Sequence, residues 1–343
     1  MESLEVRTIM VLIGLGLGIV YGSVAHRTQF CVRRGVYDLA IGKGFSSFTG
    51  WLAALGIAII GTQWLVQTEM LLLTQTNYVP EQFGIVSLLF GATIFGVGMM
   101  LTRGCPARLL VLAATGNLRA LFGVLIIGLS SYATFKGILA VPRLWFQSFM
   151  PISFPQESLI NLLPEAFQLV VSIILGLFIV ILAIKMRWSA LTFGGLIVGV
   201  LVVVSWWLTL HFGADDFDPM PPASFSFVVP TAEGLVYIML ASGVAPTFAT
   251  ALVGGTMLGA FGSAVLGKTF TWQSFAHTKD HVRYFLGSVL MGIGGVLALG
   301  CTTGQAITGM GTLSPWSLLA TMTMLLSGYL TQRWFLGQND QKW

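Results

Sequence analysis

Long apolar stretches separated by short polar segments dominate the pattern of the 343-residue chain. A helix needs about 20 predominantly apolar residues to cross a bilayer. Nine stretches come close to that length, namely residues 7–25, 45–66, 83–102, 118–140, 167–184, 190–211, 246–266, 284–300 and 314–335. The pattern therefore predicts nine transmembrane helices.

Four further apolar segments are too short to cross a bilayer. They cover about residues 30–41, 105–115, 232–243 and 301–311, and each lies between two predicted spans that are close in sequence. Interrupted helices are tolerated at membrane depth where they are buried in protein or line a watery cavity. We expect these segments to be short re-entrant half-helices, which enter the membrane and return on the same side.

The order of these elements repeats. Residues 7–140 and 190–335 both read span, short, span, span, short, span, and a linker helix at 167–184 joins them. At a constant offset of 196, Gly91, Gly96, Gly98, Leu101, Gly104 and Cys105 match Gly287, Gly292, Gly294, Leu297, Gly300 and Cys301. Each unit has four spans, so the single linker helix places the second unit upside down in the membrane. We therefore expect residues 1–343 to form one all-α polytopic membrane domain with two inverted pseudo-symmetric repeats. Transporters are built in this way, and a duplicated structural bundle is the alternative.

The composition indicates the class of protein, and the distribution of charge predicts its orientation in the membrane. Only 9% of the residues are charged, whereas soluble domains carry about 25%. With nine spans, 14 of the 17 lysines and arginines fall on one side of the membrane. Basic loops face the cytoplasm, so we expect the N-terminus outside and the C-terminus in the cytoplasm. The net charge of +4 then reflects topology, and we expect no nucleic-acid partner.

The chain has only three cysteines, and each stands at the start of a predicted short helix: Cys31, Cys105 and Cys301. Gly104 and Gly300 precede two of them, and glycine lets the backbone turn and a solute approach closely. A helix start favours an anion, and a thiol is a weak, polarizable donor. We therefore expect neutral thiols to bind a soft, sulfur-bearing anion, although an isolated buried cysteine is usually only a small apolar residue.

Further polar residues surround the cysteines. They are Arg27, Arg103 and Arg108 near the first two, and Thr302, Thr303 and Gln305 beside the third. Arginine inside a membrane is expensive and usually functional, and the alternative for some of the arginines is a cytoplasmic anchor. The four histidines have no metal-ligand spacing with the cysteines, and we find no nucleotide motif, so we expect neither a metal centre nor a cofactor.

Four pieces of the chain carry a resemblance to a known family. In order, "RTQFCVRRGVYDLA", "LFGATIFGVGMMLTRGCPAR", "PTAEGL" and "VRYFLGSVLMGIGGVLALGC" resemble the YeeE/YedE family, which includes the TsuA-type thiosulfate transporters. The resemblance covers nearly the whole chain. It implies a transporter, not an enzyme, in the inner membrane of a prokaryote, with Cys31, Cys105 and Cys301 contacting thiosulfate in turn. It also implies a possible cytoplasmic partner, a small sulfur-carrier protein of the TusA type.

The sequence departs from the family pattern at two of its motifs. Relatives often have Gly-Gly-Cys followed by a small residue and glycine, whereas this chain reads "TRGCPAR" and "ALGCTTG". The alternatives are therefore transport of another sulfur or selenium species or of a soft metal, and a membrane sulfur-transfer enzyme that uses cysteine persulfides. The predicted topology places Cys301 first on the path of an entering ion, and the family resemblance implies Cys105 second and Cys31 last.

Overall fold

The computed structural model describes residues 2–80, 82–153, 158–213, 220–274 and 278–336. The α-helices are α1 (Glu2–Thr28), α2 (Val32–Ala40), α3 (Thr49–Gln67), α4 (Ile85–Leu101), α5 (Pro106–Ala114), α6 (Leu118–Phe135), α7 (Ala140–Ser148), α8 (Glu165–Met186), α9 (Ala190–Phe212), α10 (Val228–Met239), α11 (Phe248–Leu266), α12 (Thr278–Leu297) and α13 (Pro315–Leu330). Two π-helices, η4 (Gly304–Gly309) and η5 (Thr331–Leu336), and three 3₁₀ turns, η1 (Ser46–Phe48), η2 (Leu73–Gln75) and η3 (Leu159–Leu162), complete the helical elements.

Seven helical segments among the described residues are long and apolar enough to cross a membrane. They are Val6–Ala40, Ser46–Gln67, Ile85–Ala114, Leu118–Phe135, Phe167–Met186, Ala190–Phe212 and Phe248–Leu266. These segments overlap the first seven predicted spans, and the prediction of a helical polytopic membrane protein is confirmed. The predicted spans 284–300 and 314–335 are also helical, but α12 opens with charged residues and α13 has 16 residues.

The four predicted short segments are short helices in the structure. Helices α2 and α5 lie within the predicted segments 30–41 and 105–115, and η4 lies within 301–311. The fourth, α10, begins at Val228, ahead of the predicted start at 232. Its Pro230 stands in the first turn, where the missing N–H has no intrahelical partner to lose.

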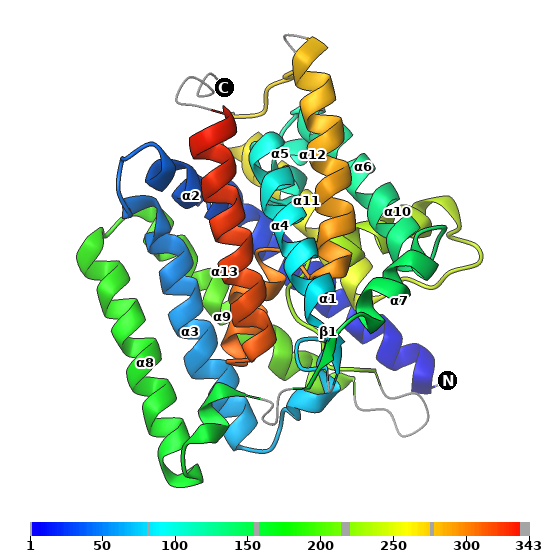
Figure 1. Cartoon of the computed structure of the whole chain (residues 1–343). Helices are drawn as coiled ribbons and strands as arrows, with labels where there is room; N and C mark the ends of the chain where they lie inside the picture. Colours follow the sequence, from blue (N-terminus) through cyan, green and yellow to red (C-terminus); the bar gives the residue numbers. More distant parts are fainter. Residues whose placement is uncertain (1, 81, 154–157, 214–219, 275–277, 337–343) are drawn as a thin grey trace.

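The predicted span 118–140 is divided. Helix α6 ends at Phe135, and the separate helix α7 follows with no buried residue. After α7 the two-residue strand β2 (Pro151–Ile152) pairs antiparallel with β1 (Phe83–Gly84), with Phe83 opposite Ile152. This pair joins the segment that follows α7 to the start of α4, as Figure 1 shows.

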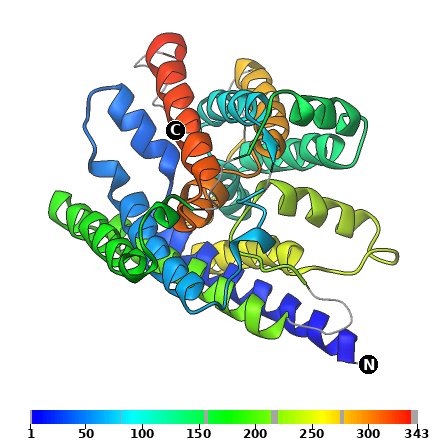
Figure 2. The same cartoon turned by 60° about the horizontal axis from the view of Figure 1, so that its bottom comes forward.

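The long helices pack side by side around a buried centre. Helix α1 lies along α11, α3 along α9, and α4 along α12, while α8 lies at the periphery against α3 (Figures 1 and 2). The outer face of α8 exposes Phe167, Ile174 and Phe178. Large apolar side chains on an outer face are expected where a helix faces lipid rather than water. The interior holds the starts of the short helices α2, α5 and η4, where Val32, Cys105 and Cys301 are buried.

Candidate functional site

Each cysteine lies just after a break between two helices. Two positions before each cysteine stands a non-glycine residue in the left-handed conformation: Gln29 (φ 56°), Arg103 (φ 57°) and Leu299 (φ 59°). A left-handed residue ends a helix and turns the chain. One more residue then leads to the cysteine, so the same short break occurs three times.

The position of the turn differs from the sequence interpretation. We expected Gly104 to make it, because glycine has the most backbone freedom. The left-handed residue is Arg103 instead, and Gly104 has a negative φ. A non-glycine residue in this conformation costs roughly 1–3 kcal/mol and persists only where the surrounding structure fixes it.

The cysteines occupy the starts of the short helices. Cys31 is the N-cap of α2 and Cys105 is the N-cap of α5, where Pro106 takes the first helical position. The Cys301 sulfur accepts the backbone N–H of Gly304 at 3.4 Å, next to the start of η4. The thiols therefore lie beside helix starts, whose N–H groups and partial positive charge favour anions.

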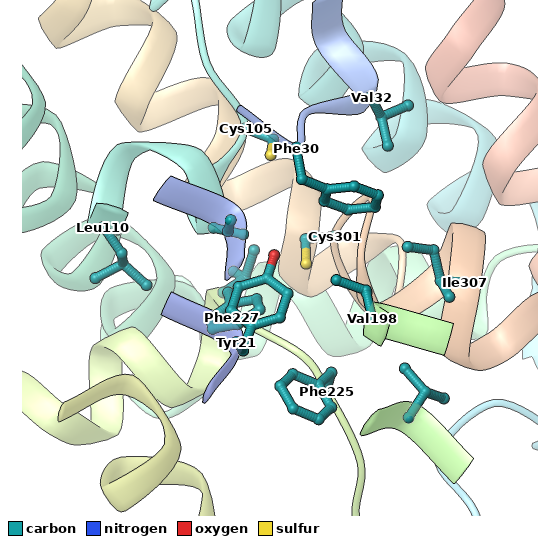
Figure 3. Close-up of a cluster of buried hydrophobic side chains, with 14 of the residues drawn as sticks. Tyr21, Phe30, Val32, Cys105, Leu110, Val198, Phe225, Phe227, Cys301 and Ile307 are labelled. Carbon is teal, nitrogen blue, oxygen red and sulfur yellow. The ribbon is translucent and has the colours of Figure 1, made fainter. Parts of the chain in front are cut away.

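Tyr21 of α1 brings the three cysteines into one neighbourhood. The side chains of Cys31 and Cys105 interact directly, and Tyr21 lies within electrostatic range of these two and of Cys301. Its hydroxyl hydrogen-bonds Thr303. Figure 3 shows this hydroxyl pointing into the space between Cys105 and Cys301. Tyr21 is not among the site residues predicted above, although it is the only aromatic residue of the first apolar stretch.

Aromatic side chains enclose Cys105 and Cys301, which we call the inner cysteines. The Tyr21 ring lies 5.2 Å from the Phe225 ring and 5.1 Å from the Phe227 ring, centroid to centroid. Cys301 is 0% exposed and Cys105 is 4% exposed. The aromatic cluster, which Figure 3 shows beside Cys301, therefore belongs to a conformation in which these two thiols are sealed from solvent.

The three polar residues after Cys301 are buried. The hydroxyl of Thr302 and the Oε1 atom of Gln305 have no hydrogen-bond partner among the described residues. The Gln305 amide nitrogen donates to the carbonyl of Ala298 at 2.8 Å, so this side chain spans the break between α12 and η4. Buried polar atoms are normally paired, so Thr302 and Gln305 offer unused hydrogen-bonding capacity beside Cys301.

A basic cavity opens beside Cys31. It has a volume of about 860 Å³ and is lined by Gln29, Cys31, Arg33, Arg34, Tyr37, Asp38, Lys43, Arg103, Arg108, Leu112, Asn117, Arg119, Gln273 and Ser274. We call this cavity the basic vestibule. Its lining has six cationic side chains and one carboxylate, which favours the entry of anions.

The three predicted arginines have different surroundings. Arg103 lines the vestibule and pairs with Asp280 at 3.9 Å. Arg108 also lines it and donates to the carbonyl of Ala25 at 3.4 Å and to the side chain of Gln29, so it ties α5 to the end of α1. Arg27 is exposed and lines a neighbouring cavity of about 440 Å³. Among the described residues, no cluster of three or more His, Cys, Asp or Glu is placed to hold a metal.

Helices broken at buried thiols, together with a charged vestibule, are features of a membrane transporter. A sequence profile of the "Sulphur transport" family matches residues 27–192 and 182–330. The chain therefore belongs to the sulphur transport family, and the resemblance found in the sequence is confirmed.

Two curated relatives match almost the full length of the chain. The thiosulfate transporter TsuA of Spirochaeta thermophila is 26% identical over 344 residues, which cover 95% of this chain and 99% of the relative. The thiosulfate transporter TsuA of Escherichia coli is 23% identical over 361 residues, covering 97% and 96%. Both relatives are transporters and not enzymes.

Proposed function

We propose that this protein takes up thiosulfate, or a closely related sulfur-containing anion, along a path of Cys301, Cys105 and Cys31. The observation that carries the proposal is that Tyr21 lies within electrostatic range of the cysteines at all three helix breaks, with Cys105 and Cys301 beside it in Figure 3. Membership of the sulphur transport family and the two relatives named as thiosulfate transporters support it.

The chemistry of the site suits this ion. Thiosulfate is a dianion with a soft terminal sulfur and harder sulfonate oxygens. Neutral thiols are weak donors that bond the terminal sulfur without holding it tightly, while helix-start N–H groups and the hydroxyls of Tyr21 and Thr302 bond the oxygens. Several weak sites in series admit an ion and also release it.

The burial of the cysteines supports the order of passage. Cys31 lines the vestibule, Cys105 interacts with Cys31, and Cys301 is fully buried and absent from the vestibule lining. If the basic vestibule faces the cytoplasm, as the positive-inside rule predicts, the ion meets Cys301 first and leaves past Cys31. The N-terminus is then outside the cell. Delivery to a cytoplasmic TusA-type carrier stays a prediction, which copurification would test.

We also propose the finer architecture of nine spanning helices and four half-helices in two inverted repeats, 7–140 and 190–335. The helix contacts support it. When each helix is replaced by its counterpart in the other repeat, the same pairs of helices are still in contact. Helix α1 packs on α11 as α9 packs on α3, and α13 packs on α4 as α6 packs on α12. The short helix α2 likewise packs on α13 as α10 packs on α6. Helix α8 falls outside the exchange, as expected for the linker.

Uptake of radiolabelled thiosulfate by cells that lack their own uptake system tests the function. We expect Cys301→Ala, Cys105→Ala and Cys31→Ala each to reduce uptake by roughly tenfold or more, because one hydrogen-bonding site of a serial path is lost. The amount of protein in the membrane should stay unchanged. Normal uptake by all three variants would defeat the proposal.

Competition by sulfate, sulfite and selenite in the same assay identifies the preferred ion. A Cys→Ser variant separates transport from sulfur transfer. The serine hydroxyl still donates a hydrogen bond, so a transport path should keep part of its uptake. A persulfide-forming enzyme would lose all activity in the serine variant and would show the added sulfur by mass spectrometry in the native protein. Metal analysis of the purified protein addresses the soft-metal alternative.

A further inference from the structure

Two arginines on different walls of the basic vestibule are buried. Arg33 belongs to α2 and Arg119 to the first turn of α6; they are 6% and 8% exposed. Both line the vestibule. The Nε–H group of each has no hydrogen-bond partner among the described residues. Buried charged groups are normally paired and hydrogen-bonded, so these two donors are suited to a ligand that the protein itself does not supply.

Arg33 and Arg119 have Tyr284 as a shared neighbour. Tyr284 lies within electrostatic range of Arg33, Arg119, Arg103 and Asp280, and Arg33 lies within range of Arg103. Asp280 is paired with Arg103 at 3.9 Å. Tyr284 therefore has three guanidinium groups and one carboxylate, Asp280, within range, which leaves an excess of positive charge around it.

The orientation of Arg33 is fixed by its own helix. Its guanidinium carbon lies 4.8 Å from the centre of the Tyr37 ring, one turn further along α2. Such stacking holds the planar group while leaving its N–H edge free to donate. An oriented, weakly hydrated guanidinium is the side chain best suited to bidentate recognition of an oxyanion.

We propose that Arg33, Arg103 and Arg119 form a binding site for a tetrahedral sulfur oxyanion at the floor of the basic vestibule. This site recognises the oxygens and the charge of the ion, whereas the cysteines recognise its terminal sulfur. It therefore binds sulfate as well as thiosulfate. Binding at this site does not depend on transport; its role as the last station after Cys31 rests on the proposed function.

Binding of radiolabelled sulfate to the purified full-length protein in detergent, at constant ionic strength set with chloride, tests the proposal. We expect saturable binding that Arg33→Gln or Arg119→Gln weakens roughly tenfold or more, because each removes a charge-assisted hydrogen bond. Arg187→Gln, at an exposed arginine outside the vestibule lining, is the matched control and should bind normally.

Two results would overturn the site: no saturable sulfate binding, or native binding by both Gln variants. If the Gln variants do not fold, Arg33→Lys and Arg119→Lys keep the charge but lose the planar fork. Severalfold weaker binding by well-folded Lys variants then supports the site, and native binding contradicts it. Sulfate binding without any thiosulfate uptake would leave the site standing and remove only the proposed function.

Discussion

Tyr21 is the side chain that connects the three cysteines at the scale of single residues. It is 2% exposed, its ring packs against Phe225 and Phe227, and its hydroxyl bonds Thr303. The ring and the hydroxyl therefore have separable tasks. The ring seals the inner thiols, and the hydroxyl is a donor where the ion would pass.

Tyr21→Phe separates these tasks. We expect thiosulfate uptake to fall about fivefold, since one neutral hydrogen bond contributes about 1 kcal/mol, while the thermal midpoint stays close to that of the native protein. Tyr237→Phe, at the far end of α10, is the matched control. Native uptake by Tyr21→Phe would show that the hydroxyl takes no part in passage.

The sequence located the cysteines but not the side chains that complete their surroundings. Cysteine is rare in this chain, so three copies at helix starts stand out. Tyr21 has no such signal, because one tyrosine in an apolar helix is equally typical of lipid-facing or core positions. The left-handed Arg103 was missed because Gly104, the residue that favours this conformation, stands directly after it.

At the scale of elements, the crossing of α4 and α12 shows why glycines recur in both helices. A methyl group at Gly98 would lie 2.5 Å from the Gly287 carbonyl oxygen, and one at Gly287 would lie 2.9 Å from that of Gly98. Gly91 and Gly294 face each other in the same way, at 2.6 and 2.9 Å. The offset of 196 relates Gly91 to Gly287 and Gly98 to Gly294, so it converts one glycine pair into the other. This is expected if a two-fold axis passes through the crossing. Small residues allow such close approach in membrane bundles.

Gly98→Ala tests this crossing. The added methyl group meets backbone atoms of α12, so we expect the free energy of unfolding to fall by about 1–3 kcal/mol, as in other overpacked interiors. Gly254→Ala on α11, where nothing lies within 4 Å of an added methyl, should be neutral or stabilising. Fluorescence-monitored thermal unfolding in detergent compares the two. Equal midpoints would contradict the packing role.

At the scale of the whole molecule, access to the thiols is one-sided. Cys31 lines the vestibule, whereas Cys105 and Cys301 are buried and sealed. Transport of an ion past Cys301 therefore requires a second conformation in which the aromatic side chains Tyr21, Phe225 and Phe227 separate. Movement of one repeat against the other is how inverted-repeat transporters open alternately.

Thiol labelling tests this asymmetry and the orientation. A variant that keeps only Cys31 should react with a membrane-impermeant maleimide in inside-out vesicles at least several times faster than one that keeps only Cys301. In intact cells the Cys31-only variant should be protected, because in the proposed orientation its vestibule faces the cytoplasm. Labelling of Cys31 from outside the cell would reverse the orientation, and faster labelling of Cys301 in the vesicles would contradict the sealed state.

The sequence by itself determined the class of the protein, its long helices, its four short helices and the place of each cysteine at a helix start. These features depend on local apolar length and on residue type, which the chain displays directly. Only the tertiary structure decided that Tyr21 lies within electrostatic range of all three thiols, that Arg27 lines the neighbouring cavity and not the vestibule, and that Arg33 and Arg119 both line the vestibule. These are contacts between residues far apart in the chain, and they depend on how the helices pack, which no single segment encodes.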